Sequence, residues 1–285
     1  MLSIMSSIDA VLRALVDGLL FPFRTMPPLV GLVVVSVLAS MGMLLVYKAT
    51  SNQRKLAAVK DQITAGLFEI RLFNDDLRAL FRSQFEILRN NFTYLGLSLV
   101  PMVWLIVPFV LVVAQLHHHY AFGGLEPGKR VLFEVALVDD WSTKVPAGEE
   151  GRPPLSLEVP DGLTADSPPV WIPSLNEVTW RLTPEREGTY AIGVRVGGES
   201  YEKSIEVTDR VVRRAPTRFA ADFWKLLLYP AESPLPADGA LRAVSVGYPP
   251  AVIDVFGVHV DWLVAFLVLS IAFAFGLRNR FGVTI

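Results

Sequence analysis

The sequence predicts an α-helical membrane protein with three transmembrane helices, a helical hairpin, and an immunoglobulin-like β-sandwich inserted between the second and third spans. Of its 285 residues, 52% are hydrophobic and only 19% are charged, which is too apolar for an ordinary soluble protein. Three long apolar runs carry this excess. Residues 129–208 instead alternate apolar with polar side chains between clusters of proline and glycine, which is typical of short antiparallel strands.

Residues 1–27 predict an amphipathic helix that lies in the membrane interface. Asp9, Arg13 and Asp17 fall away from a single apolar face, whose members are Ile8, Val11, Leu12, Leu15 and Leu19. The Pro27–Pro28 pair then separates this helix from the first span. A helix that packs against a partner protein is the alternative interpretation.

The three apolar runs predict three spanning helices. Leu29 to Tyr47 and Tyr94 to Leu116 contain no charged residue, and about 20 residues suffice to cross the hydrocarbon core of a bilayer. Trp262 to Leu277 is also chargeless but short, so we expect it to extend backward through Asp261 toward Val255. The predicted spans are residues 28–48, 94–116 and 258–277.

Residues 49–93 predict an antiparallel helical hairpin. One apolar stripe follows alternating three- and four-residue steps through Leu56, Val59, Ile63, Gly66, Ile70 and Phe73, and a second follows Leu77, Phe81, Phe85, Leu88 and Phe92. Asn74 or Asp75 between them suits a turn and a helix N-cap. We expect Ile63 and Phe85 to be buried against each other or against a partner. A single bent helix is the alternative.

Residues 117–215 predict the sandwich, with five to seven short strands separated by turn sequences. Residues 216–257 predict a second interfacial helix and a linker, because "RFAADFWKLLLYP" is amphipathic and aromatic. Residues 278–285 form a short tail.

The basic residues predict the orientation. Eight of them lie in residues 48–93, two more follow the third span at Arg278 and Arg280, and residues 120–128 have none. Cytoplasmic flanks carry the excess of Lys and Arg. The hairpin and the C-terminus are therefore expected in the cytoplasm, with the N-terminus and the sandwich outside, in the inner membrane of a bacterium.

No motif for covalent chemistry is present, so we predict that the protein is not an enzyme and uses no cofactor. The chain has no cysteine, and its net charge of −2 gives no indication of a DNA partner. The weak metal-ligand candidates are His117, His118, His119, His259 and Asp261. Packing at the membrane interface is the favoured interpretation of these side chains, so no metal is predicted.

Ser36 and Ser40 lie one helical turn apart on one face of the first span. Small hydroxyls are routine in helix packing, and this is the favoured interpretation. The alternative is a polar groove open to the cytoplasm, continued by Lys48, Asn52 and Gln53. The hairpin residues that are candidates to contact another protein are Arg54, Lys55, Lys60, Arg71, Arg78 and Arg82.

The segments "LFPFRTMPPLVGLVVVSVLASMGMLLVYK" and "SNQRKLAAVKDQI", then the hairpin and "YLGLSLVPMVWLIVPFVLV", occur in an order that resembles the core of the YidC/Oxa-type insertase superfamily. That superfamily includes small archaeal members and the third subunit of the ER membrane protein complex. The resemblance covers residues 8–116 and 258–280. It departs from the bacterial pattern because no basic residue lies inside the first span, so Lys48 at its rim is the nearest substitute.

The resemblance implies a groove that opens to the cytoplasm and to lipid and eases polar segments into the bilayer, where a charge costs at least a few kcal/mol. It also implies that the hairpin meets the client. The expected function is therefore membrane protein insertion or chaperone-like assembly, with lipid, client membrane proteins or other membrane-complex subunits as partners and the ribosome as a further candidate. The alternative is a membrane-anchored structural or binding protein whose sandwich recognises a partner.

Overall fold

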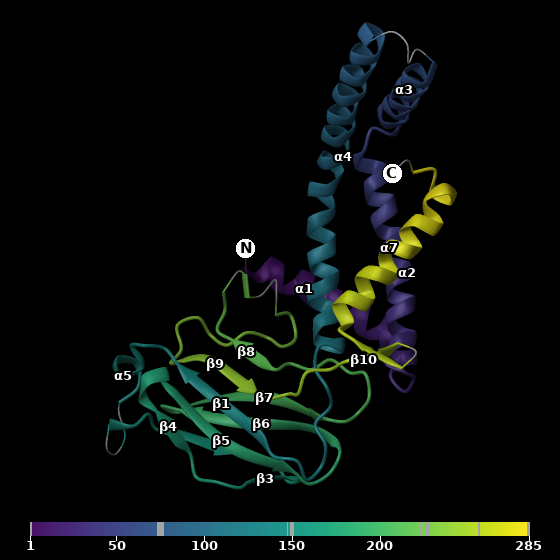
Figure 1. The fold of residues 1–285 in the computed structure, drawn as a ribbon. Coiled ribbons are helices and arrows are strands. Elements are labelled where there is room, and N and C mark those ends of the chain that lie inside the picture. Colours follow the sequence, from purple (N-terminus) through teal and green to yellow (C-terminus); the bar gives the residue numbers. More distant parts are fainter. Residues whose placement is uncertain are drawn as a thin grey trace. The chain divides into compact units, whose positions relative to one another are not determined.

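The structure is a computed structural model that describes residues 2–72, 77–146, 148, 151–222, 224–225, 229–255 and 257–283, with the side chains of residues 2–9, 77 and 79 left out. Its contacts divide the chain into two compact units (Figure 1). Unit 1 contains residues 1–31 and 113–265. Unit 2 contains residues 32–112 and 266–285. Each unit is described below by itself.

Three helices are long and apolar enough to cross a bilayer, as predicted: α2 (Pro28–Thr50), α4 (Leu77–Tyr120) and α7 (Trp262–Phe281). The expected backward extension of the third span is wrong. Residues 253–260 form a two-stranded hairpin of β10 (Ile253–Val255) and β11 (Val258–Val260). The Asp261 carboxylate then accepts the backbone N–H of Leu263 at 2.8 Å and caps α7, so this helix gains its length at the other end, through Arg278 and Arg280.

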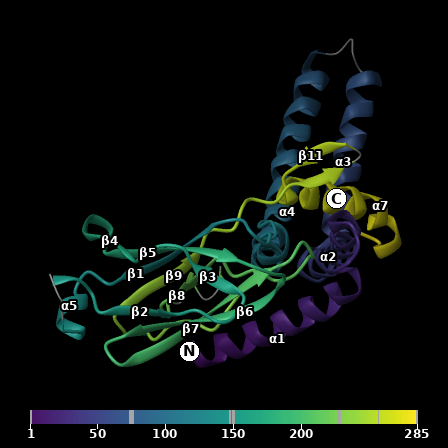
Figure 2. The ribbon, with the colours of Figure 1, turned by 90° about the horizontal axis from the view of Figure 1, so that it is seen from below.

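Unit 2 also holds a pair of packed helices, formed by α3 (Gln53–Leu72) and the first part of α4. Helix α3 lies beside this part of α4 (Figures 1 and 2). A Cβ added to Gly66 would lie 2.7 Å from Ile87 Cγ1, and the hydroxyl of Ser83 donates to the Glu69 carboxylate at 2.9 Å. These contacts hold the two helices together, whereas the turn candidates Asn74 and Asp75 lie outside the described residues.

Of the two expected partners for the phenylalanine stripe, α3 is not one, and burial against another protein stays a prediction. Ile63 is half-buried, but Phe85 is 69% exposed. Ile87 follows Phe85 by two residues, which places it about 200° around the helix. Because α3 covers the Ser83 and Ile87 side of α4, the phenylalanine side is left uncovered within the chain.

Unit 1 contains two antiparallel sheets. The larger sheet has the order β3-β5-β1-β9-β8 with β4 also paired to β5, and the smaller has the order β2-β6-β7. The strands through β7 are β1 (Val131–Leu137), β2 (Leu155–Glu158), β3 (Leu163–Ala165), β4 (Val170–Ile172), β5 (Glu177–Pro184), β6 (Gly188–Val196) and β7 (Glu199–Val207). Both sheets contribute to one core, in which Phe133 and Trp180 of the larger sheet join Ile192 and Ile205 of the smaller. Two sheets that share one core form a β-sandwich.

The expected boundary of this region at residue 215 is wrong. Thr217–Phe219 forms β8 rather than the start of an interfacial helix, and Leu241–Val246 forms β9, which lies between β1 and β8 in the larger sheet. The sheet therefore requires residues from beyond the predicted boundary. Short elements complete the unit: η1 (Phe21–Phe23), α5 (Trp141–Lys144) and η3 (Pro173–Leu175).

The N-terminal helix α1 (Leu2–Leu20) matches the predicted helical segment in position. On its predicted apolar face, Val11 and Leu15 are 59% and 64% exposed, whereas Leu12 and Leu19 are half-buried, so the chain covers that face only in part. Ile8 and Asp9 are among the residues whose side chains are not described. At its end, Leu20 is 1% exposed and anchors the helix in unit 1.

Candidate functional site

The serine pair of α2 is buried between helices of unit 2. Ser36 is 0% exposed and Ser40 is 2% exposed. The Ser40 hydroxyl lies 2.6 Å from the carbonyl of Ser36 and 2.8 Å from the carbonyl of Ser270 on α7, and its single proton serves one of them at a time. Among the described residues, the hydroxyls of Ser36 and Ser270 have no hydrogen-bond partner. The three serines thus form a polar seam between α2 and α7, and Ser270 is a member that the sequence interpretation missed.

The other groove candidates make local contacts at the ends of helices. The Lys48 ammonium donates to the Phe281 carbonyl at 2.7 Å, at the end of α7. The Asn52 side chain accepts the backbone N–H of Lys55 at 3.1 Å and caps the start of α3, while the Gln53 amide donates to the Ser51 hydroxyl. The structure brings Ser36 and Ser40 together with α7 but does not place Asn52 or Gln53 against them.

The basic hairpin candidates are all exposed: Arg54, Lys55, Lys60, Arg71, Arg78 and Arg82. Arg82 pairs with Glu86 one turn along α4 at 3.0 Å. A pair as exposed as this one contributes little to stability.

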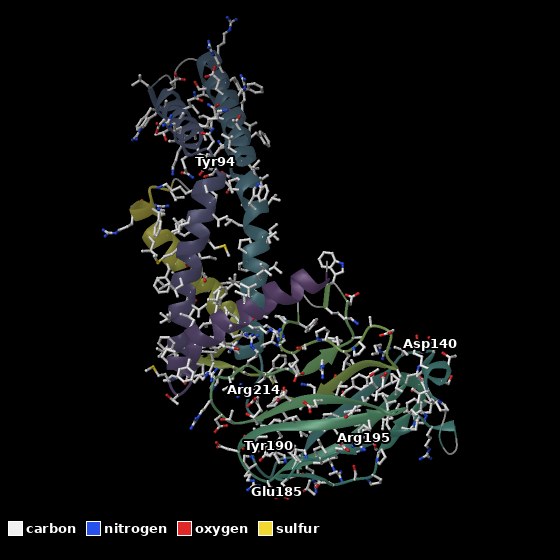
Figure 3. All side chains as sticks on the ribbon, turned by 180° about the vertical axis from the view of Figure 1, so that it is seen from behind. Tyr94, Asp140, Glu185, Tyr190, Arg195 and Arg214 are labelled. Atoms are coloured by element: carbon white, nitrogen blue, oxygen red, sulfur yellow. The ribbon has the colours of Figure 1, made fainter. Side chains whose placement is uncertain are left out.

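The most prominent exposed feature of unit 2 is an apolar stripe along α4. Its eight members recur at alternating four- and three-residue steps, and each is between 49% and 69% exposed; we call this set the α4 apolar face: Phe81, Phe85, Leu88, Phe92, Leu95, Leu99, Met102 and Ile106. Tyr94, labelled in Figure 3, marks where the predicted second span begins. The face therefore continues from the hairpin part of α4 into its spanning part.

The histidines pack against aromatic and polar groups. His117 contacts the rings of Phe122 and Trp262 edge-on or tilted, with ring centroids 5.0 and 5.9 Å away. His259 and Asp261 are exposed. No group of three or more potential metal ligands occurs within the part of the chain that the structure describes.

His119 belongs to an ionic network in unit 1 that the sequence interpretation missed. Its Nε2 lies 2.9 Å from Asp17 on α1, and Arg213 approaches the same carboxylate at 3.2 Å. Burial raises the pKa of Asp17, but the hydrogen bond from His119 and the charge of Arg213 outweigh this and hold the pKa below its ordinary value. Arg213 also donates to the side chain of Gln115 at 2.9 Å. Residues almost 200 positions apart thus fix α1 in place, and no local pattern announces such a pairing.

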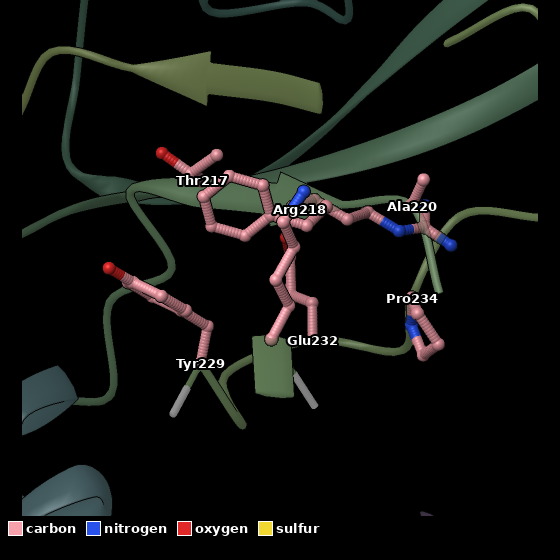
Figure 4. A pocket seen from close by; sticks show the side chains of 8 residues that line it. Thr217, Arg218, Ala220, Tyr229, Glu232 and Pro234 are labelled. Carbon is pink, nitrogen blue, oxygen red and sulfur yellow. The ribbon is translucent and has the colours of Figure 1, made fainter. Parts of the chain in front are cut away.

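A second ionic pair is buried in the sandwich. The Lys203 side chain on β7 is fully buried and lies 2.8 Å from the Glu232 carboxylate, whose side chain is 16% exposed. Figure 4 shows Glu232 beside a hollow lined also by Thr217, Arg218 and Tyr229. That hollow has a volume of only about 10 Å³, too little for any ligand larger than a single water molecule. The pair therefore reads as structural, not as a binding site.

No family model, no curated protein and no solved structure matches this chain. The resemblance to the insertase superfamily accordingly stays a prediction. The polar seam, the α4 apolar face and the exposed basic hairpin are the features from which a function can be argued.

Proposed function

We propose that the chain is an insertase or assembly factor for membrane proteins, which acts by binding an apolar segment of its client without covalent chemistry. The observation that carries the proposal is the α4 apolar face, which is uncovered from Phe81 to Ile106. Exposed apolar patches of this extent are rare on monomers unless they face lipid or a partner. The part from Phe81 to Phe92 precedes the predicted span, so lipid alone does not account for it.

The spacing of the α4 apolar face suits a helical client. A repeat of 3.5 residues is the pattern of a seam between two helices. From Phe81 to Ile106 the face extends for about 38 Å at 1.5 Å per residue, which is longer than the hydrocarbon core of a bilayer. A client helix that binds first near Phe85 can shift along the α4 apolar face into the membrane without exposing its apolar side chains to water.

The proposal includes an orientation. The eight basic residues of 48–93 support a cytoplasmic hairpin, because Lys and Arg are retained on that side. In this arrangement the sandwich, which we propose to be immunoglobulin-like, lies outside the inner membrane of a bacterium. Exposed Arg82 and Arg89 lie beside the α4 apolar face and would favour clients or ribosomal surfaces that carry negative charge.

The experiment is client insertion in reconstituted vesicles. We compare the wild type with Phe85→Asp/Phe92→Asp and with the matched control Asn91→Asp/Thr93→Asp, which adds the same charge at exposed positions beside the seam. Each phenylalanine contributes about 1.5 to 3 kcal/mol when buried. We therefore expect insertion to fall at least roughly tenfold for the first pair and little for the control. Equal insertion by both pairs would refute the client path along α4.

A second candidate function, the membrane-anchored binding protein, is favoured by the packing of Ser36 and Ser40, since both are buried against helices in the described structure. If the polar seam between α2 and α7 opens during insertion, Ser36→Leu with Ser40→Leu should reduce insertion of a client with a polar tail. Lys48→Glu should reduce it further at low salt. If both variants insert clients normally, and the α4 variants do too, the anchored binding protein is the better account.

A further inference from the structure

The α4 apolar face has the register of a coiled coil along its whole length. Its members alternate four- and three-residue steps without a break, which is the heptad pattern of a two-helix interface. Such a pattern requires a partner helix whose apolar positions match over the same length. The a positions are Phe85, Phe92, Leu99 and Ile106, and the d positions are Phe81, Leu88, Leu95 and Met102.

The packing of α4 on α3 leaves these positions free. Ser83 and Ile87, through which α4 contacts α3, fall at f and c positions of the same heptad, on the side of the helix opposite to a and d. Pro101 and Pro108 also take c positions, so the backbone hydrogen bonds that these prolines remove lie on that opposite side too. A further helix can therefore bind along the a and d positions without displacing α3.

The α4 apolar face offers enough area for a stable interface. With roughly 200 Å² of total surface per side chain, its eight members expose about 900 Å². A stable interface between two proteins typically buries about 800 Å² on each of them. The face is about 38 Å long, whereas the hydrocarbon core measures about 30 Å. Its partner must therefore continue an apolar stripe beyond the bilayer, and a second α4 in the same membrane orientation does so at the same height.

The polar residues beside the α4 apolar face suit a parallel pair of two copies. In a parallel coiled coil, the residue at a g position faces the e residue that lies five positions later in the other helix. Gln84 then faces the second copy's Arg89, and Asn91 faces the second copy's Gly96. Neither pair has like charges, and the side-chain oxygen of Gln84 can accept a hydrogen bond from the guanidinium. An antiparallel pair would need two copies with opposite membrane orientations.

We propose that two copies of the chain pair in parallel along the α4 apolar face and cover it when no client is bound. The inference rests on the proposed function, because it assigns the regulation of the same face: a client helix gains access when the two copies separate. From Phe81 to Phe92, pairing removes apolar side chains from water, so the hydrophobic effect stabilises it there. From Leu95 to Ile106, inside the bilayer, side-chain packing between the two helices contributes instead.

Cysteine cross-linking of the full chain in reconstituted vesicles tests the pairing, because the chain has no cysteine of its own. Leu99→Cys changes an a position, and its control Val100→Cys changes the neighbouring b position, which is 58% exposed. Phe92→Cys and exposed Thr93→Cys form a second matched pair outside the predicted span. A parallel pair brings each a residue beside the same residue of the other copy, so oxidation with copper phenanthroline should give at least roughly fivefold more disulfide-linked dimer at a than at b. Equal yields within each matched pair would overturn the pairing.

Client insertion by the cross-linked chain tests the regulation. Oxidised Leu99→Cys should insert at least roughly fivefold less client than its reduced form, because the disulfide makes the pairing intramolecular and a client cannot displace it. Dithiothreitol should restore insertion, and oxidised Val100→Cys should insert normally. Unchanged insertion by the cross-linked dimer would overturn the regulatory role of the pairing.

The two assays separate a failure of the pairing from a failure of the proposed function. If the a positions do not cross-link but Phe85→Asp/Phe92→Asp loses insertion, the pairing is wrong and the client path along α4 stands. If the a positions cross-link but Phe85→Asp/Phe92→Asp inserts clients normally, the two copies pair and the client path is wrong.

Discussion

The buried ion pair of Lys203 and Glu232 predicts how the free energy of unfolding changes when one of the two charges is removed. The Lys203 ammonium donates to the Ala215 carbonyl at 2.5 Å and the Ser204 carbonyl at 3.1 Å, and it forms an ion pair with the Glu232 carboxylate at 2.8 Å. Burial lowers the pKa of Lys203, and the Glu232 carboxylate acts in the opposite direction.

Glu232→Gln removes the anion that pairs with the buried ammonium while leaving a neutral oxygen in its place. Breaking a buried pair in this way costs about 3 to 5 kcal/mol, and we expect the lower end because the amide still accepts a hydrogen bond. Lys203→Met leaves an apolar side chain of similar length on the core face of β7, and Glu232 retains its bonds from the Ser204 amide and hydroxyl. We expect Lys203→Met to cost no more than about 1 kcal/mol.

Hydrogen exchange of the β6 and β7 amides in the full chain measures these differences as local opening free energies. Glu232→Gln should accelerate exchange about a hundredfold, and the double variant should exchange more slowly than Glu232→Gln alone. Because the folded pKa of Lys203 lies below 10.5, the unfolded state binds more protons between these values, and wild-type stability should rise with pH there relative to Lys203→Met. If the double variant is no more stable than Glu232→Gln, the charge argument is wrong.

Two further predictions concern the other contacts. Gly66→Leu should speed hydrogen exchange across residues 53–72 by roughly tenfold or more, because the added side chain overpacks against Ile87. Phe85→Asp and the control Ala58→Leu change exposed positions and should leave this exchange nearly unchanged. Faster exchange in Phe85→Asp than in Gly66→Leu would show that the phenylalanine stripe is the packing face. Ionised Asp17 should stabilise the chain above about pH 4, and this contribution should disappear as the pH falls through its lowered folded pKa. The unfolding temperature of Asp17→Asn should therefore lie below that of the wild type at neutral pH and change less with pH below about pH 4. An acid profile identical to that of the wild type would contradict the network.

Much of the architecture was determined by the sequence alone. The thickness of a bilayer sets the length of a spanning helix, so the chargeless runs were enough to identify three candidates. The alternation of apolar and polar residues predicted short strands within residues 129–208, where β1 to β7 lie, since successive side chains point to opposite faces of a sheet. These signals are local, so they can be interpreted without knowing which elements pack against each other in the fold.

Only the tertiary structure decided which faces meet. The pattern of residues 49–93 predicted one apolar stripe on each helix of the hairpin, but α3 packs on the Ser83 and Ile87 side of α4 and leaves Phe85 exposed. The contact of Ser40 with Ser270 joins residues 230 positions apart, and the pairing of β8 with β9 turned a segment with a helical pattern into a strand. Such pairings depend on long-range contacts, whose energy overrides local propensity and leaves no periodic trace in the sequence.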